Sequence, residues 1–120
     1  MATVNLTKEL FEERVARIPS HLSELKFTGK KPAVVDFYAA WCAPCRQLSP
    51  LVEELSDYYG GKVDFYKVDV EKESGLATFF GVRSIPTLVL FSPGGTVQHL
   101  TGAMPKAQLK ELVDKLLLGG

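Results

Sequence analysis

The chain has 120 residues, of which 46% are hydrophobic, and its 14 basic residues balance 14 acidic residues to a formal net charge of zero. This length and composition predict one packed α/β domain over residues 1–120 and exclude a disordered chain. A neutral chain has no basic surface for nucleic acid or anionic lipid, and no run approaches the roughly 18 apolar residues of a membrane-spanning helix.

The first predicted elements are a short edge strand over residues 3–5 and a helix with Thr7 as its N-cap. Three apolar side chains repeat at helical spacing in this helix: Phe11, Val15 and Ile18. Pro19 is expected to stop the helix. The apolar residues within 20–31 need cover, so we expect a packed loop or an extra helical turn there.

A buried strand is predicted from the apolar, β-branched run over residues 33–38, and it leads into the sequence Trp-Cys-Ala-Pro-Cys at 41–45. These residues begin a helix, where free amides and the helix dipole stabilise an anion, so the thiol of Cys42 should ionise readily. Helical spacing brings Cys45 to the same face, close enough for a bond between the sulfurs. We expect this helix to kink at Pro50 and to end near Tyr58.

The remaining chain predicts two helices and three strands. In order they are a strand over 63–70, a helix over 73–80, a strand over 87–91, a turn over 93–95, a strand over 97–101 and a helix opened by Pro105. The succession begins with crossover connections and ends with a hairpin. It therefore predicts a mixed sheet between layers of helices, with the strand order left open.

Two cysteines in a C-x-x-C spacing favour redox chemistry over a disulfide scaffold. The alternatives are a pair of inert buried thiols or half of a zinc site. A structural zinc ion normally takes four ligands, and the two histidines, His21 and His99, do not have the usual ligand spacing. We therefore expect no metal and favour a dithiol.

The segment Asp-Phe-Tyr-Ala-Ala-Trp-Cys-Ala-Pro-Cys at 36–45 resembles the active-site segment of the thioredoxin family. The resemblance continues through Pro50, Lys-Val-Asp at 67–69, Ile-Pro-Thr at 85–87 and Gly102. It implies the thioredoxin fold, in which four helices flank a central mixed five-stranded sheet, the strand before the cysteines is central, and the proline of 85–87 is cis.

Two residues depart from the family pattern. Ala43 stands where glycine is usual, and Tyr38 stands where tryptophan is commoner. The first departure could shift the redox poise modestly, and neither removes a reacting group.

The resemblance also implies roles for four catalytic residues. Cys42 would attack a disulfide, and Cys45 would resolve the product, leaving a redox-active Cys42–Cys45 disulfide. Asp36 would lie beneath Cys45 and move its proton, and the Lys67 ammonium would approach this carboxylate. From the residues alone, a surface base paired with Asp36 is the alternative, and Lys67 could equally be a solvated strand lysine.

A substrate groove is expected around Trp41. Because this residue lies beside a reactive cysteine, we expect its side chain to be partly exposed and to form one wall of the groove; the alternative is an ordinary core tryptophan. By resemblance the groove takes in neighbouring residues of the motif and of three later segments: Ala43, Pro44, Val70, Ser84, Ile85, Pro86, Gly102 and Ala103.

The function implied by the resemblance is a protein-disulfide reductase, a dithiol electron carrier that acts on disulfide-containing proteins. We expect a bacterial monomer without bound cofactor that is reduced again by an external reductase. This reductase would be an NADPH-dependent flavoprotein in the cytoplasm, or a membrane thiol relay if the protein is exported. Charges at residues 8–14 interrupt any signal peptide, which favours the cytoplasm.

Two alternative functions remain open. One is an oxidant or isomerase of the same fold, although Ala-Pro between the cysteines resembles the Gly-Pro of reductants more than the Pro-His or Gly-His of oxidant relatives. The other is a binding subunit that uses the Trp41 groove without turnover.

Overall fold

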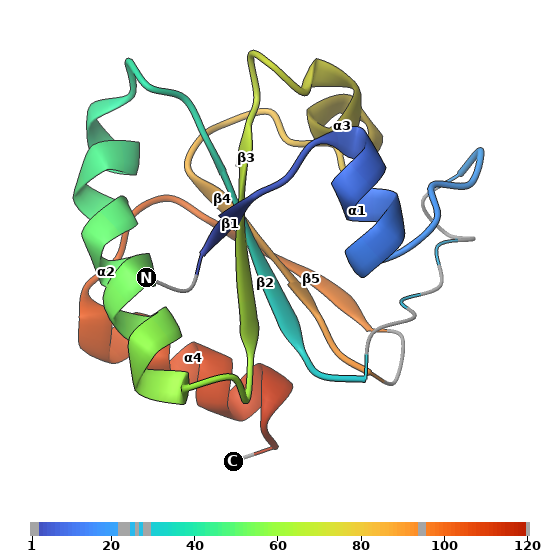
Figure 1. Ribbon diagram of the computed structural model, residues 1–120. Coiled ribbons are helices and arrows are strands. Elements are labelled where there is room, and N and C mark those ends of the chain that lie inside the picture. Colours follow the sequence, from blue (N-terminus) through green and yellow to red (C-terminus); the bar gives the residue numbers. More distant parts are fainter. Residues whose placement is uncertain (1–2, 22–24, 26, 28–29, 94–95, 120) are drawn as a thin grey trace.

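A computed structural model describes residues 3–21, 25, 27, 30–93 and 96–119 of the chain (Figure 1). Strands and helices follow one another in the predicted order. Their bounds are β1 (Val4–Asn5), α1 (Lys8–Arg14), β2 (Ala33–Tyr38), α2 (Ala43–Tyr59), β3 (Asp64–Asp69), α3 (Ser74–Phe79), β4 (Thr87–Phe91), β5 (Val97–Thr101) and α4 (Lys106–Leu117).

The strands form one mixed sheet in the order β1-β3-β2-β4-β5. Strand β3 pairs in parallel with both β1 and β2, whereas β4 pairs antiparallel with β2 and with β5. Strand β2 is therefore central, and its Asp36 is flanked by Lys67 of β3 and Leu88 of β4. The predicted five-stranded mixed sheet with the cysteine-bearing strand at its centre is confirmed.

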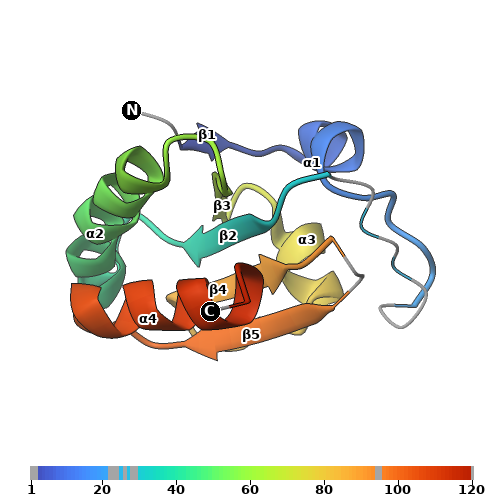
Figure 2. The same cartoon turned by 90° about the horizontal axis from the view of Figure 1, so that it is seen from below.

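Two helices cover each face of the sheet, α2 and α4 on one side and α1 and α3 on the other (Figures 1 and 2). Side chains alternate along β2, so Val34 packs in the core under α2 and α4, and Val35 and Phe37 pack in the core under α1 and α3. By the same alternation Asp36 lies on the α2/α4 face. This places a carboxyl group under the helix that carries the cysteines.

Helix α1 is shorter than predicted. Thr7 is its N-cap, as expected, and accepts a hydrogen bond from the Leu10 amide (3.2 Å), but the helix ends at Arg14. Pro19 cannot donate a helical hydrogen bond and disfavours the helical conformation of Ile18, so the last predicted turn does not form. The apolar stripe nevertheless persists, with Val15 buried and Ile18 packed against the same core.

Residues 20–31 pack against the core where the structure describes them. Leu25 is buried, and the Phe27 ring lies 5.7 Å from that of Phe91. The prediction of a packed loop is thus confirmed at these two positions. The alternative of an extra helical turn is not seen, since none of the described residues of 20–31 is helical. The other residues of this segment lie outside the described part of the chain.

The other differences at element ends are small. Helix α2 runs through Pro50 and ends at Tyr59, one residue later than predicted, with Gly60 in the left-handed conformation at φ 55°. Strand β3 and helix α3 are each one residue shorter at both ends than predicted. Pro105 is the N-cap of α4 and not its first residue. Of the predicted turn over 93–95, only Pro93 belongs to the described residues.

Candidate active site

The two cysteines lie at the start of α2, directly after the central strand. Cys42 is the N-cap of the helix and Cys45 lies in its first turn. They form a disulfide with their Cα atoms 5.2 Å apart, and both side chains are buried. The redox pair inferred from the C-x-x-C spacing is therefore joined in the folded chain.

The Cys42 sulfur lies where backbone groups of two elements meet. The amide of Cys45 donates to it over 3.2 Å, and the Ile85 carbonyl oxygen lies 3.8 Å away, in the segment before β4. An amide donor at a helix N-terminus stabilises negative charge on a sulfur atom. After reduction, the same contact would favour the thiolate form of Cys42.

Asp36 of β2 is fully buried in the central strand that leads to the cysteines. Neither of its carboxylate oxygens has a hydrogen-bond partner among the described residues. Burial raises the pKa of Asp36 to about 7, and the positive charge of Lys67 opposes part of this rise. A carboxyl group with a pKa near neutrality can both accept and return a proton under physiological conditions.

The Lys67 ammonium is held by α2 and by the central strand. It donates a hydrogen bond to the Ser49 hydroxyl (2.9 Å) and lies 4.6 Å from the centre of the Tyr38 ring. No ion pair joins it to Asp36 within 4 Å, although the two residues are paired in the sheet register. Lys67 thus acts on the carboxylate through space and is more ordered than a solvated strand lysine.

A pocket of about 270 Å³ opens beside the resolving cysteine. It is lined by residues of β2, α2 and β3 and of the connection between β2 and α2: Tyr38, Ala39, Ala40, Cys45, Arg46, Ser49 and Lys67. Sequence reasoning assigned no part in the site to Ser49 or to the Tyr38 ring. The spacing could have indicated Ser49, because it follows Cys45 by four residues and so shares its helix face.

The residues predicted to form the substrate groove surround the disulfide only in part. Trp41 is 66% exposed, which contradicts the core alternative. Val70 and Ile85 pack against the buried cysteines. Ala43 and Pro44 are exposed at the start of α2.

The remaining groove residues belong to the segments on either side of β4 and β5. The Ile85–Pro86 bond is cis, as the resemblance implied, and the Gly102 amide donates to the Pro86 carbonyl oxygen (2.8 Å). Gly102 has φ 91°, a conformation that favours glycine. Ser84 is exposed, and Ala103 lines a separate pocket of about 280 Å³ between α2 and the start of α4.

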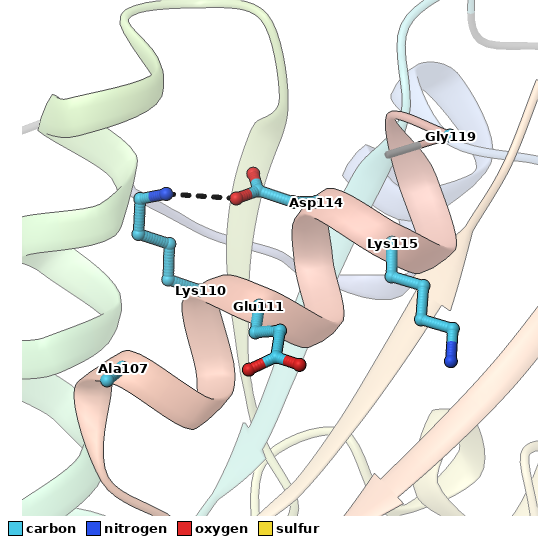
Figure 3. A pocket seen from close by; sticks show the side chains of 6 residues that line it. All are labelled: Ala107, Lys110, Glu111, Asp114, Lys115 and Gly119. Carbon is cyan, nitrogen blue, oxygen red and sulfur yellow. Dashed lines mark hydrogen bonds and ion pairs between the residues drawn. The ribbon is translucent and has the colours of Figure 1, made fainter.

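A larger pocket of about 440 Å³ lies on α4 (Figure 3), and neither cysteine lines it. It is lined by Ala107, Lys110, Glu111, Asp114, Lys115 and Gly119. Lys110 and Asp114 form an ion pair with each other (2.9 Å), and Lys115 points away from both. These residues belong to one helix and its end, and none is a predicted site residue. We therefore assign the chemistry to the smaller pocket beside Cys45.

The described residues contain no cluster of three or more His, Cys, Asp or Glu side chains that could hold a metal ion. In the same part of the chain, no helix has both the length and the apolar character needed to cross a bilayer.

Comparisons with known proteins agree with the resemblance. The family model described as Thioredoxin matches residues 2–115. A thioredoxin of Staphylococcus haemolyticus is 39% identical over 98% of this chain and 100% of its own length, and one of Borreliella burgdorferi is 36% identical over 92% and 93%. A chloroplastic thioredoxin M-type of Pisum sativum is 41% identical over 82% of this chain. The chain spans about half the length of the relatives it matches in pea, Arabidopsis thaliana and spinach, 57% in the pea protein.

Proposed function

Since the chain belongs to the thioredoxin family, we propose that it is a thiol–disulfide oxidoreductase that reduces disulfides in partner proteins. One observation carries the proposal: the Cys42–Cys45 disulfide lies at a helix N-terminus that follows the central strand, and this strand buries the Asp36 carboxyl, which has no hydrogen-bond partner among the described residues. Relatives named thioredoxin do not favour an oxidant, an isomerase or a binding subunit over this activity.

In the first step the reduced protein attacks. The Cys42 thiolate, stabilised by the Cys45 amide, forms a bond to one sulfur of the partner's disulfide. The bond between the two partner sulfurs breaks, and the second partner sulfur leaves as a thiolate that takes up a proton. A mixed disulfide now joins Cys42 to the partner.

In the second step the mixed disulfide is resolved. Asp36 accepts the proton of the Cys45 thiol, and the resulting thiolate attacks the Cys42 sulfur. The bond between Cys42 and the partner breaks, and the released partner sulfur is protonated. Two electrons and two protons have then passed to the partner, and the protein is left with the disulfide seen in the structure.

Extended polypeptide is the substrate form that suits the site. The exposed Trp41 ring would pack against one side of a substrate segment, and the Ile85 carbonyl oxygen, 3.8 Å from the Cys42 sulfur, lies close to where the exchanging sulfur would be. Val70, Ile85 and Gly102 would line the rest of the contact.

The oxidised protein needs an external dithiol to return to its reduced state. We assign this role to an NADPH-dependent flavoprotein reductase, with no cofactor bound to the chain itself. We propose a bacterial cytoplasmic protein, since two relatives that match more than nine-tenths of this chain are thioredoxins of bacteria.

A trapping experiment tests the proposal. The variant Cys45→Ser retains the attacking thiol but lacks the resolving one, so it should accumulate a mixed disulfide with a disulfide-containing protein, detectable on a non-reducing gel. Cys42→Ser, the matched control, should accumulate none. The wild type should catalyse reduction of the same protein by dithiothreitol. Equal trapping by the two variants, or no catalysis by the wild type, would contradict the proposed function.

A further inference from the structure

Ser49 joins the helix of the cysteines to the lysine of the neighbouring strand. It lies on α2, one helical turn beyond Cys45, and its hydroxyl accepts a hydrogen bond from the Lys67 ammonium (2.9 Å). The contact connects residues that are 18 positions apart in the chain. Both side chains line the 270 Å³ pocket that Cys45 also lines.

The ammonium has a second contact that constrains it. The Tyr38 ring lies 4.6 Å from the nitrogen, and the Tyr38 hydroxyl donates to the Asn5 side-chain oxygen on β1 (3.1 Å). The ring is therefore itself anchored at both ends, by β2 and by the edge strand. Ser49 and Tyr38 together define one place for the charge, although a lysine side chain is long and flexible.

The place of this charge matters because Asp36 has no hydrogen-bond partner among the described residues. Asp36 interacts electrostatically with Lys67 on β3 and with Tyr38 on its own strand. Its neighbour on β4, Leu88, does not titrate. The Arg46 guanidinium donates instead to the Ala40 carbonyl oxygen (2.9 Å), and the joined cysteines do not ionise. Lys67 is the cation that lowers the pKa of Asp36 against the effect of burial.

We propose that Ser49 is a positioning residue that acts through Lys67: its hydroxyl holds the ammonium on the wall of the pocket beside Cys45, so that Asp36 can take the Cys45 proton at neutral pH. Without the hydroxyl, the ammonium would move towards water, where its effect on the buried carboxylate is weaker because charges interact less across water and over longer distances. The inference deepens the proposed function and rests on it for its kinetic consequence.

The direct test is the titration of the Asp36 carboxyl carbon by NMR in the oxidised protein. In this form the cysteines do not titrate, so the curve belongs to Asp36 without coupling to a thiol. In Ser49→Ala the midpoint should rise by about 0.5 pH units, less than the 1–3 units expected of an opposite charge in close contact. Ser49→Thr keeps a hydroxyl and should restore the wild-type midpoint.

Two further variants separate positioning from a general effect of the substitution. Ser56→Ala makes the same change two turns further along α2, and it should leave the Asp36 midpoint unchanged. In a Lys67→Met background, which has no ammonium to hold, Ser49→Ala should produce no further shift. An unchanged midpoint in Ser49→Ala, a fall in that midpoint, or the same shift with and without Lys67 would overturn the proposal.

The kinetic consequence is measured separately. The pH profile for release of the partner from its mixed disulfide with Cys42 should move upward in Ser49→Ala by the same amount as the Asp36 midpoint. A wild type that fails to reduce protein disulfides would contradict the proposed function but leave the NMR titration readable. A normal reductase whose Asp36 midpoint ignores Ser49 would contradict the positioning role alone.

Discussion

The two faces of the central sheet are built from the same strands but differ in composition. Under α1 and α3 the core is apolar and rich in aromatic rings, with Phe80 in contact with Phe11, Phe37 and Phe91 at centroid distances of 5.5–5.9 Å. Under α2 and α4 the core is mainly aliphatic, and Asp36 follows Val34 on the same face of β2.

This difference indicates a division of labour between the faces. An unpaired buried carboxyl group opposes folding at neutral pH, because the charged form loses its hydration without gaining a partner. The apolar face buries no such carboxyl group. The free energy gained from its burial offsets the cost of burying Asp36 on the other face. The reactive cysteines and the proton acceptor both lie on the α2/α4 side or at its end, where the chain accepts an unfavourable group.

Truncation at the centre of the aromatic face should have the largest effect on stability. Phe80→Ala removes a ring that contacts four others and leaves a cavity between α3 and the sheet. We expect the free energy of unfolding to fall by roughly 3–5 kcal/mol. Urea denaturation of the oxidised protein measures this change. Phe80→Leu fills most of the space and should lose much less. A loss below about 1 kcal/mol for the alanine variant would show that this face is not the main stabilising core.

Substitution of the buried acid should have the opposite sign and depend on pH. The pKa of Asp36 is raised in the folded chain to about 7, whereas in an unfolded chain an aspartate titrates near 4. Its contribution to stability is therefore fully present below pH 4 and is lost as the pH rises towards 7, at about 1.4 kcal/mol per pH unit. Asp36→Asn lacks this loss and should be more stable than the wild type by on the order of 3 kcal/mol at pH 7.

Urea denaturation at several pH values between 4 and 8 tests this prediction. Asp57→Asn, at an exposed position of α2, controls for removal of a carboxylate as such. If the stability of Asp36→Asn followed that of the wild type in parallel over this range, the pKa of Asp36 would not be raised in the folded chain. The same variant should slow release of the partner from its mixed disulfide, because the Cys45 proton has lost its acceptor.

The smallest effect is expected where the two helices of the α2/α4 face meet. The Tyr59 hydroxyl donates to the Asp114 carboxylate (2.6 Å), and this bond is the main cause that lowers the pKa of Asp114. Tyr59→Phe should reduce the free energy of unfolding by about 1 kcal/mol at neutral pH. The loss should shrink in acid as Asp114 becomes protonated and its charged acceptor disappears. A loss that stayed constant over the whole acid range in which the protein remains folded would point to packing instead of the charged hydrogen bond.

Much of the local structure could be predicted from neighbouring residues in the sequence. The Thr7 cap, the start of α2 at the cysteines and the hairpin of β4 and β5 depend on contacts within a few positions, which the residue pattern contains. The order of the strands could not be read in this way. The family resemblance implied only that the cysteine-bearing strand is central, and the full order came from the structure, because alternating apolar residues show that a strand is buried but not which strand lies beside it.

The sequence by itself determined that the chain forms an α/β fold and that a reactive cysteine pair begins a helix, since both follow from short-range spacing. Only the tertiary structure decided the electrostatic environment of that pair, which includes the state of Asp36 and the position of the Lys67 ammonium. From the residues alone, Asp36 could have paired with a surface base and Lys67 could have been solvated. The fold instead buries the carboxyl with no hydrogen-bond partner among the described residues, and it brings the ammonium into contact with Ser49 and the Tyr38 ring. These contacts join residues far apart in the chain, and the pKa of a group depends on burial and on neighbours that only folding brings together.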